Sequence, residues 1–165
     1  MDKLHAYWRM PYLENSDNEP KDPHLFANLP KNPNDKDTLV LYRGIYTYLV
    51  MNKFPYNAGH LLAVPYREVA DLECLEKDER ADLMETILLG KKCLQKNLAP
   101  DGFNIGFNLG KSAGAGIANH LHGHVVPRWS GDNNFMPVLS QTRVLPEALE
   151  NMWIKLYPFF NNCCQ

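Results

Sequence analysis

Five short segments of the chain have the hydrophobic patterns of β-strands, in which apolar residues alternate with polar ones or run together between turn residues. In 103–109, Phe, Ile, Phe and Leu occupy every second position, with Asn and Gly between them. Arg43-Gly44 separates the first two segments, which predicts a tight turn and therefore a hairpin. The five predicted strands are 38–42, 46–52, 60–64, 103–109 and 120–126.

Two further segments carry apolar residues at helical spacing. The first, 76–97, has three acidic residues in its first turn, where they suit the positive end of the helix dipole. The second, 145–156, has Pro146 in its first turn and is expected to end at Pro158. Because short connections between neighbouring strands favour antiparallel pairing, the pattern predicts an α+β fold.

Two parts of the chain lack such a pattern. Residues 15–37 are polar, contain four prolines and show no periodicity, so we expect an irregular surface excursion within a single domain that covers 1–165. Residues 161–165 contain the adjacent Cys163 and Cys164 and are expected to form a frayed tail.

Composition and charge narrow the range of partners. The 165 residues carry 17 basic and 19 acidic side chains, and a net charge of −2 does not suit non-specific binding to nucleic acid. No apolar stretch is long enough for a membrane span, and the N-terminus lacks the apolar core of a signal peptide. The four cysteines form no C-x-x-C pair, which favours free thiols in a reducing compartment. We therefore expect a cytoplasmic protein with no nucleic-acid or membrane partner.

Three of the six histidines fall within five residues, at His120, His122 and His124. In a strand, these side chains would form one row on one face, with about 6.5–7 Å between neighbours. The intervening residues would then face the core, where Gly123 would leave a gap.

This row of histidines has three interpretations. It is a surface strand that carries His by chance, a zinc site with an open water position, or a catalytic site that acts on a phosphate. In the last case the central His attacks phosphorus, while its neighbours fix its tautomer and manage protons. The flanks favour catalysis, because the glycine-rich segment 108–116 can present backbone N–H groups to an anion, and Lys111 and Ser112 can add donors. Downstream, Arg128 can pair with phosphate oxygens.

These residues resemble the histidine triad superfamily of nucleotide hydrolases and transferases. The signature is His-x-His-x-His followed by two apolar residues, which 120–126 matches. Residues 52–62 look like the nucleoside-binding hairpin of that family. Residues 127–138, with Trp8-Arg9-Met10, resemble a bacterial branch that includes diadenosine tetraphosphate phosphorylases, also called ATP adenylyltransferases.

The resemblance implies a role for each matching residue. His122 would be the nucleophile on the α-phosphorus, giving a nucleotidyl-histidine, and His120 and His124 would orient it and bind or protonate the phosphate and leaving group. Asn52 would hydrogen-bond the ribose, and His60 would support the histidines from a neighbouring strand. The other residues expected at the nucleotide are Asn108, Lys111, Ser112, Gly114, Gly116, Ile117, Arg128 and Trp129.

The resemblance also implies a five-stranded antiparallel sheet with two helices, paired as a homodimer into a ten-stranded sheet, with a tetramer as the alternative. Many relatives hold zinc with a C-x-x-C motif, whereas this chain has His24-Leu25-Phe26-Ala27 there. We therefore expect no required cofactor, although a divalent cation can accompany the substrate. Many relatives have Gln or Ser where this chain has Gly116, so the backbone must supply that phosphate contact.

The expected function is cleavage of a phosphoric anhydride through a nucleotidyl-histidine. The preferred reaction is phosphorolysis of diadenosine tetraphosphate to ADP and ATP. The alternatives are hydrolysis of a dinucleoside polyphosphate and hydrolysis of a nucleoside phosphoramidate. A nucleotide-binding sensor with weak catalysis is the alternative from a different class.

Overall fold

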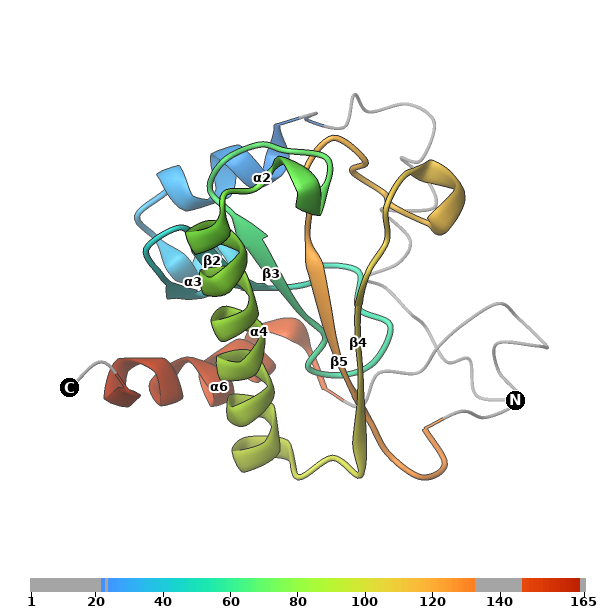
Figure 1. Cartoon of the computed structure of the whole chain (residues 1–165). Coiled ribbons are helices and arrows are strands. Elements are labelled where there is room, and N and C mark those ends of the chain that lie inside the picture. The colour runs from blue at the N-terminus through green and yellow to red at the C-terminus, as the bar shows by residue number, and fades with distance from the viewer. Residues whose placement is uncertain (1–21, 23, 133–146, 164–165) are drawn as a thin grey trace.

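The computed structural model describes residues 22, 24–132 and 147–163. Its centre is one five-stranded sheet in the order β1-β2-β3-β5-β4, in which every neighbouring pair is antiparallel. The predicted α+β fold with a five-stranded antiparallel sheet is therefore confirmed (Figure 1). The strands are β1 (Val40–Arg43), β2 (Thr47–Met51), β3 (Leu61–Pro65), β4 (Gly102–Phe107) and β5 (Gly123–Arg128).

The turn between β1 and β2 forms where the sequence predicts it. The backbone N–H of Gly44 donates to the carbonyl of Thr47 at 2.8 Å and closes the turn. A Cβ atom at Gly44 would lie only 2.9 Å from that same oxygen, so the close approach requires glycine.

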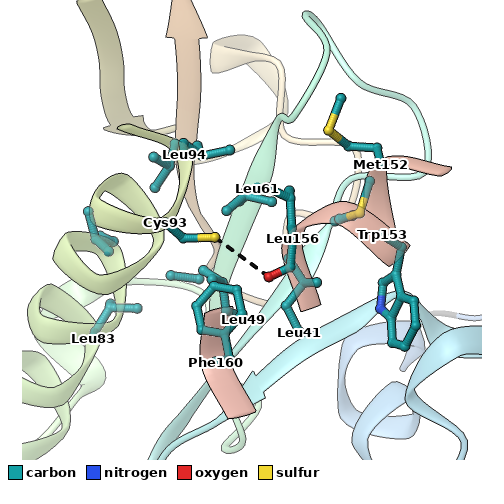
Figure 2. Packing of buried hydrophobic residues seen from close by; sticks show 14 of the residues in the cluster. Leu41, Leu49, Leu61, Leu83, Cys93, Leu94, Met152, Trp153, Leu156 and Phe160 are labelled. Atoms are coloured by element: carbon teal, nitrogen blue, oxygen red, sulfur yellow. Dashed lines mark hydrogen bonds between the residues drawn. The ribbon is translucent and has the colours of Figure 1, made fainter. Parts of the chain in front are cut away.

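Helices α4 (Lys77–Leu98) and α6 (Leu149–Cys163) pack on one face of the sheet (Figure 1). A capping box starts α4, since the side chains of Glu76 and Glu79 each accept a backbone N–H of the other. Figure 2 shows the main core between these two helices and the sheet, where Cys93 Sγ lies 3.8 Å from the carbonyl oxygen of Leu156. None of the helices in the described ranges is long and apolar enough to cross a membrane.

Short helical turns supply a second core on the opposite face of the sheet. They are α2 (Leu25–Asn28), η1 (Leu29–Lys31) and α3 (Asp35–Thr38). Phe26 of α2 is buried there, and its carbonyl accepts the Tyr48 hydroxyl at 2.7 Å. The residues packed around Phe26 include Val40, Tyr48, Val50, Leu62 and Val64.

The expectation of an irregular excursion is therefore wrong for much of 24–37, while 15–21 and 23 lie outside the described residues. Turns of three or four residues are too short to show periodicity, and docking of Phe26 on the sheet stabilises them instead. Two further 3₁₀ turns, η2 (Leu72–Cys74) and η3 (Lys111–Ala113), lie elsewhere in connections.

The C-terminal helix also differs from the prediction, because α6 continues through Pro158 to Cys163. The predicted frayed tail is therefore helical at 161–163, while 164–165, like Pro146, lie outside the described residues. A proline inside a helix costs about 3 kcal/mol, because it removes a hydrogen bond and crowds the preceding turn. Burial of Phe160 beyond the proline is worth about 1.5–3 kcal/mol, which is of the same order and favours continuation of the helix.

We expect Phe160→Ala to lower the free energy of unfolding by about 3 kcal/mol, because it leaves a cavity beneath the last turns of α6. The matched control is Ile154→Ala on the exposed side of the same helix, for which we expect a change within about 0.5 kcal/mol. Urea denaturation followed by circular dichroism measures both. Equal losses in the two variants would show that helix propensity, and not core burial, holds the end of α6.

Candidate active site

The three histidines do not lie on one regular strand. Only His124 belongs to β5, where it pairs with Leu62 and Gly106, whereas His120 and His122 precede the strand. The expected row along 120–126 is therefore wrong for its first half. The register would place His122 and the residue before it opposite the end of β3, and Pro65 at that end has no N–H to continue the ladder.

Gly123 leaves no gap in the core beneath the histidines. A Cβ atom there would lie 2.8 Å from Phe107 and 3.0 Å from Ile87, so the rings of β4 and the side chains of α4 already fill the space. The expectation of a gap is wrong, and glycine at this position permits close packing beneath the site.

Backbone carbonyls fix the tautomers of His120 and His122. Nδ1 of His122 lies 2.8 Å from the carbonyl oxygen of His120, and Nε2 of His120 lies 2.8 Å from that of Pro65. Because a carbonyl oxygen only accepts, each of these nitrogens carries the proton. His122 therefore keeps its lone pair on Nε2, and His120 keeps its lone pair on Nδ1.

A backbone N–H fixes the tautomers of the other two imidazoles, those of His60 and His124. The amide of Tyr56 donates to Nδ1 of His60 at 3.1 Å, and the side-chain amide of Asn52 lies 3.3 Å from the same atom. The proton of His60 is therefore on Nε2, which lies 2.9 Å from Nδ1 of His124 and donates to it. By the same argument, neutral His124 carries its proton on Nε2.

Two buried ring nitrogens are left for a ligand. Within the described residues, Nε2 of His124 and Nδ1 of His120 have no hydrogen-bond partner. Buried polar atoms are nearly always paired, so these two point to an absent partner. The rings of His122 and His124 lie 5.1 Å apart between centroids, so the imidazole with the free lone pair neighbours the imidazole that carries the N–H donor.

Burial keeps the imidazoles neutral. Desolvation lowers the pKa of His120 and of His122. Desolvation, with the charge of neighbouring imidazoles, lowers the pKa of His124 to about 4 and that of His60 to about 3. A neutral His122 is therefore available at pH 7 as a nucleophile.

Helix α2 lies against the histidines and is tied to their segment. The ring of Phe26 lies 5.0 Å from that of His122. Nδ1 of His24 lies 2.7 Å from the Glu68 carboxylate, whose other oxygen accepts the side-chain amide of Asn119 at 2.7 Å. His24, which stands where many relatives have a zinc ligand, thus pairs with a carboxylate. Among the described residues no group of three or more His, Cys, Asp or Glu could hold a metal ion. The expectation about a cofactor stays a prediction.

The predicted phosphate loop begins beside the histidines. Phe107 pairs with Gly123, so Asn108 follows next to His122, and a Cβ atom at Gly114 would lie 3.8 Å from the Asn108 amide. Glycine suits this loop, since Gly110 and Gly114 have φ of 81° and 93°. Of the remaining predicted residues, Lys111, Ser112 and Gly116 are exposed and Ile117 packs against the cluster around Phe26.

The loop is wound on itself. The N–H groups of Ala113, Gly114 and Ala115 donate to carbonyls of Gly110 and Lys111. Those three amides are therefore occupied, and a phosphate bound by them would first have to unwind η3.

The structure does not bring Arg128 and Trp129 to the histidines. Arg128 lies four positions beyond His124 along β5, which corresponds to about 13 Å. Its guanidinium pairs with both carboxylate oxygens of Asp132, at 2.6 and 2.9 Å, and with Asn104 at 2.6 Å. The backbone N–H of Trp129 also donates to Asp132. Arg128 thus makes structural contacts in this chain, and its role at a nucleotide stays a prediction.

The sequence reasoning missed two aromatic side chains at the site. Phe26 lies in a segment without periodicity, so the sequence carries no signal for it. Tyr56 stacks on His124 and lies tilted against His60. Its signal in the sequence is its place in the segment 52–62 that resembles the nucleoside-binding hairpin.

Comparison with known proteins agrees with this geometry. The sequence model of the HIT domain family matches residues 34–131. This chain belongs to the HIT domain family. The predicted resemblance to the histidine triad superfamily is therefore confirmed, while the extent of a single domain over 1–165 stays a prediction. Residues 8–10 and 133–138, which carry part of the resemblance, lie outside the described residues.

Individual HIT relatives cover much of the chain. A protein of Mycobacterium tuberculosis named AP-4-A phosphorylase is 42% identical over 161 residues, covering 91% of this chain and 81% of the relative. A Saccharomyces cerevisiae bis(5'-adenosyl)-triphosphatase is 34% identical over 95 residues, covering 57% of this chain and 46% of the relative. A zinc-bound histidine triad family protein of Mycobacterium smegmatis superposes with a TM-score of 0.62 at 26% identity, covering 76% of this chain and 86% of that one.

The lowered pKa values of the buried histidines predict acid sensitivity. Below the unfolded pKa of about 6.5, the unfolded chain binds protons on these two histidines. In the folded chain His124 binds its proton only near pH 4 and His60 only near pH 3. The unfolding free energy therefore falls as the pH drops through this window, by at most about 1.4 kcal/mol per pH unit for each such group. His60→Gln removes one of the two titrating imidazoles and should reduce the slope of the unfolding free energy against pH. Urea denaturation midpoints between about pH 7 and about pH 5 measure this slope.

The matched control is His24→Gln. In the wild type, the hydrogen bond to Glu68 raises the pKa of His24. The contribution of His24 to the free energy of unfolding is therefore complete below pH 6.5 and is lost only as the pH rises. We expect this variant to keep the acid slope of the wild type. An unchanged slope in His60→Gln would contradict the neutral assignment of the buried pair.

Proposed function

We propose that this HIT protein cleaves a phosphoric anhydride of a dinucleoside polyphosphate through a covalent intermediate on His122. The observation that carries the proposal is the set of tautomers. The carbonyl of His120 holds the proton of His122 on Nδ1. The hydrogen bond from His60 Nε2 to His124 Nδ1 holds the proton of His124 on its Nε2. A nucleophile and a hydrogen-bond donor are thus preorganised side by side in a buried site.

The reaction follows from these two atoms. The lone pair of His122 Nε2 attacks the α-phosphorus, an N–P bond forms, and the bond from phosphorus to the bridging oxygen breaks. With diadenosine tetraphosphate, ATP leaves and AMP stays on His122. The N–H of His124 stabilises negative charge on a phosphoryl or leaving oxygen. An oxygen of inorganic phosphate then displaces His122 and yields ADP.

The relatives support this substrate class. The Mycobacterium tuberculosis relative is named an AP-4-A phosphorylase, and the match covers most of both chains. The Saccharomyces cerevisiae triphosphatase, which matches over a shorter region, favours hydrolysis as the second candidate. Water and phosphate attack the same intermediate, so the acceptor is the point on which the two candidates differ.

We also propose that no protein-bound metal takes part, because His24 pairs with Glu68 at the place of a zinc ligand in many relatives. Any divalent cation then enters with the polyphosphate. The cytoplasmic location expected from the sequence is part of the same proposal.

The test is turnover of diadenosine tetraphosphate with and without inorganic phosphate, with the products separated by anion-exchange chromatography. We expect ADP and ATP only when phosphate is present, because phosphate resolves the intermediate. Without phosphate, protein denatured at alkaline pH, where the N–P bond is stable, should carry one adenylyl group by mass spectrometry. AMP and ATP formed without phosphate would instead identify a hydrolase.

His122→Ala is the companion variant. Loss of the nucleophile should lower the rate by about 10⁴-fold or more and abolish adenylylation. If the wild type binds the substrate but neither variant nor wild type turns it over, the sensor alternative gains support. Turnover of His122→Ala at the wild-type rate would rule out the covalent mechanism.

We further propose that two copies pair through β4, which is an edge strand of the sheet. Ile105 in this strand is 44% exposed, and an apolar edge strand is a template for pairing with a second chain. Met84 and Leu88 are exposed on one face of α4, and Lys91 lies on the same face. The ammonium of Lys91 lies 5.5 Å from the Phe103 ring, so this face of the helix adjoins β4. The strand edge and the helix stripe together suit a second copy.

Ile105→Lys should therefore turn a dimer into a monomer, because a charged edge residue opposes strand pairing. Size-exclusion chromatography with light scattering measures the mass. Ile154→Lys, an equally exposed apolar position on α6, is the matched control and should leave the dimer intact. A monomeric wild type, or a dimeric Ile105→Lys, would contradict the proposed interface.

A further inference from the structure

Tyr56 lies in the connection from β2 to β3 and touches both imidazoles of the hydrogen-bonded His60–His124 pair. Its ring lies 5.7 Å from that of His124 between centroids, with an interplanar angle of only 13°. The same ring lies 4.6 Å from that of His60 at 42°. Its backbone N–H donates to Nδ1 of His60. One residue thus holds this pair by both its backbone and its side chain.

We propose that Tyr56 is a positioning residue that keeps the His60–His124 pair in a single neutral tautomer, with the His124 Nε2–H directed at the substrate. The catalytic part of this inference rests on the proposed function. The tautomeric part concerns the histidines alone and is testable without a substrate.

The backbone contact sets the direction of the pair. An amide N–H can only donate, so it stabilises a lone pair on Nδ1 of His60 and with it the proton on Nε2. If that proton moved to Nδ1, it would face the amide of Tyr56, and His124 would have to donate from its own Nδ1. Nε2 of His124 would then become an acceptor and would repel a phosphate oxygen.

The side chain keeps water from the pair. His60 and His124 are both buried, although the connection that covers them lies at the surface. Tyr56 itself is 44% exposed, with its ring on the imidazoles, so it separates them from solvent. Without that ring, water can pair with either nitrogen and can stabilise a second proton.

The connection is anchored close to Tyr56. The side-chain amide of Asn57 donates to the carbonyl of Pro127 at 3.1 Å and to Asp132 at 2.7 Å. Asp132 is held in turn by Arg128, while Oδ1 of Asn52 accepts the backbone N–H of Phe54. These contacts limit movement of the Tyr56 ring. Arg128 contributes to them by holding Asp132, which binds Asn57.

The electrostatic surroundings of the pair are simple. Among the described residues, the groups that act on the charge of His60 are His124 and His122, and the group that acts on His124 is His122. On the opposing strands, the partners of His124 are Leu62 and Gly106, which carry no charge. Solvent access is therefore the main property of the pair that loss of the Tyr56 ring would change.

The experiment compares Tyr56→Ala with Tyr56→Phe and with Tyr46→Ala. Tyr56→Phe keeps the aromatic ring and Tyr56→Ala removes it. Both variants keep the backbone N–H that faces His60, so the comparison isolates the effect of the ring. Tyr46 is 42% exposed in the turn between β1 and β2, at the end of β3 opposite to His60, and controls for loss of an exposed tyrosine. Long-range ¹H–¹⁵N correlation spectra of the histidine rings identify the protonated nitrogen of each imidazole at neutral pH.

We expect single Nε2–H tautomers of His60 and His124 in the wild type, Tyr56→Phe and Tyr46→Ala, and mixed tautomers in Tyr56→Ala. In turnover, Tyr56→Ala should lower kcat about tenfold with a smaller change in KM, since one donor is weakened and not removed. The acid limb of kcat/KM should move up by about one pH unit, because exposed imidazoles protonate more easily.

Unchanged tautomers in Tyr56→Ala would overturn the inference whatever the enzyme does. An equal loss of kcat in Tyr56→Phe would assign the effect to the hydroxyl and would also overturn it. A rise in KM alone, with kcat and the acid limb unchanged, would show that Tyr56 contacts substrate instead. If no dinucleoside polyphosphate is turned over, the proposed function fails, and the ring spectra still decide the tautomeric part.

Discussion

The active site depends on hydrogen bonds between imidazoles and backbone groups that can only donate or only accept. Each of these backbone groups decides whether the ring nitrogen that it faces carries a proton or a lone pair. They are the carbonyls of His120 and Pro65 and the amide of Tyr56. Four neutral imidazoles with defined tautomers result. A nucleophilic nitrogen and a donor nitrogen can then stand side by side without a charge on either, whereas exposed histidines would exchange tautomers and protons with water.

The sheet and its two cores supply the burial that this arrangement needs. The helices α4 and α6 cover one face of the sheet (Figure 2). Ile87 of α4 and Phe107 of β4 lie against Gly123, directly beneath the histidines. The short helix α2 covers the other face, where Phe26 contacts His122. Desolvation from both sides lowers the pKa values of the histidines and so keeps their lone pairs available.

The far end of β5 supports the site from behind. Arg128 and Asp132 join the end of the strand to Asn57, and through it to the connection that carries Tyr56. An arginine near a phosphate-binding sequence suggests a phosphate ligand. In the folded chain, a carboxylate within the same turn already satisfies its guanidinium, and two parallel hydrogen bonds of this kind are strong. The positive charge therefore organises the protein before any nucleotide arrives.

The sequence alone determined the strand and helix pattern, the α+β class and the HIT family, because these depend on local periodicity and on the spacing of a five-residue motif. Only the tertiary structure decided that β5 starts at Gly123, that α6 continues past Pro158 and that Phe26 lies against His122. Each of these results depends on contacts between residues far apart in the chain: Pro65 ends a ladder, and Phe160 and Phe26 are buried. The tautomers belong to the same group, because they depend on which backbone atom folding brings to each ring nitrogen.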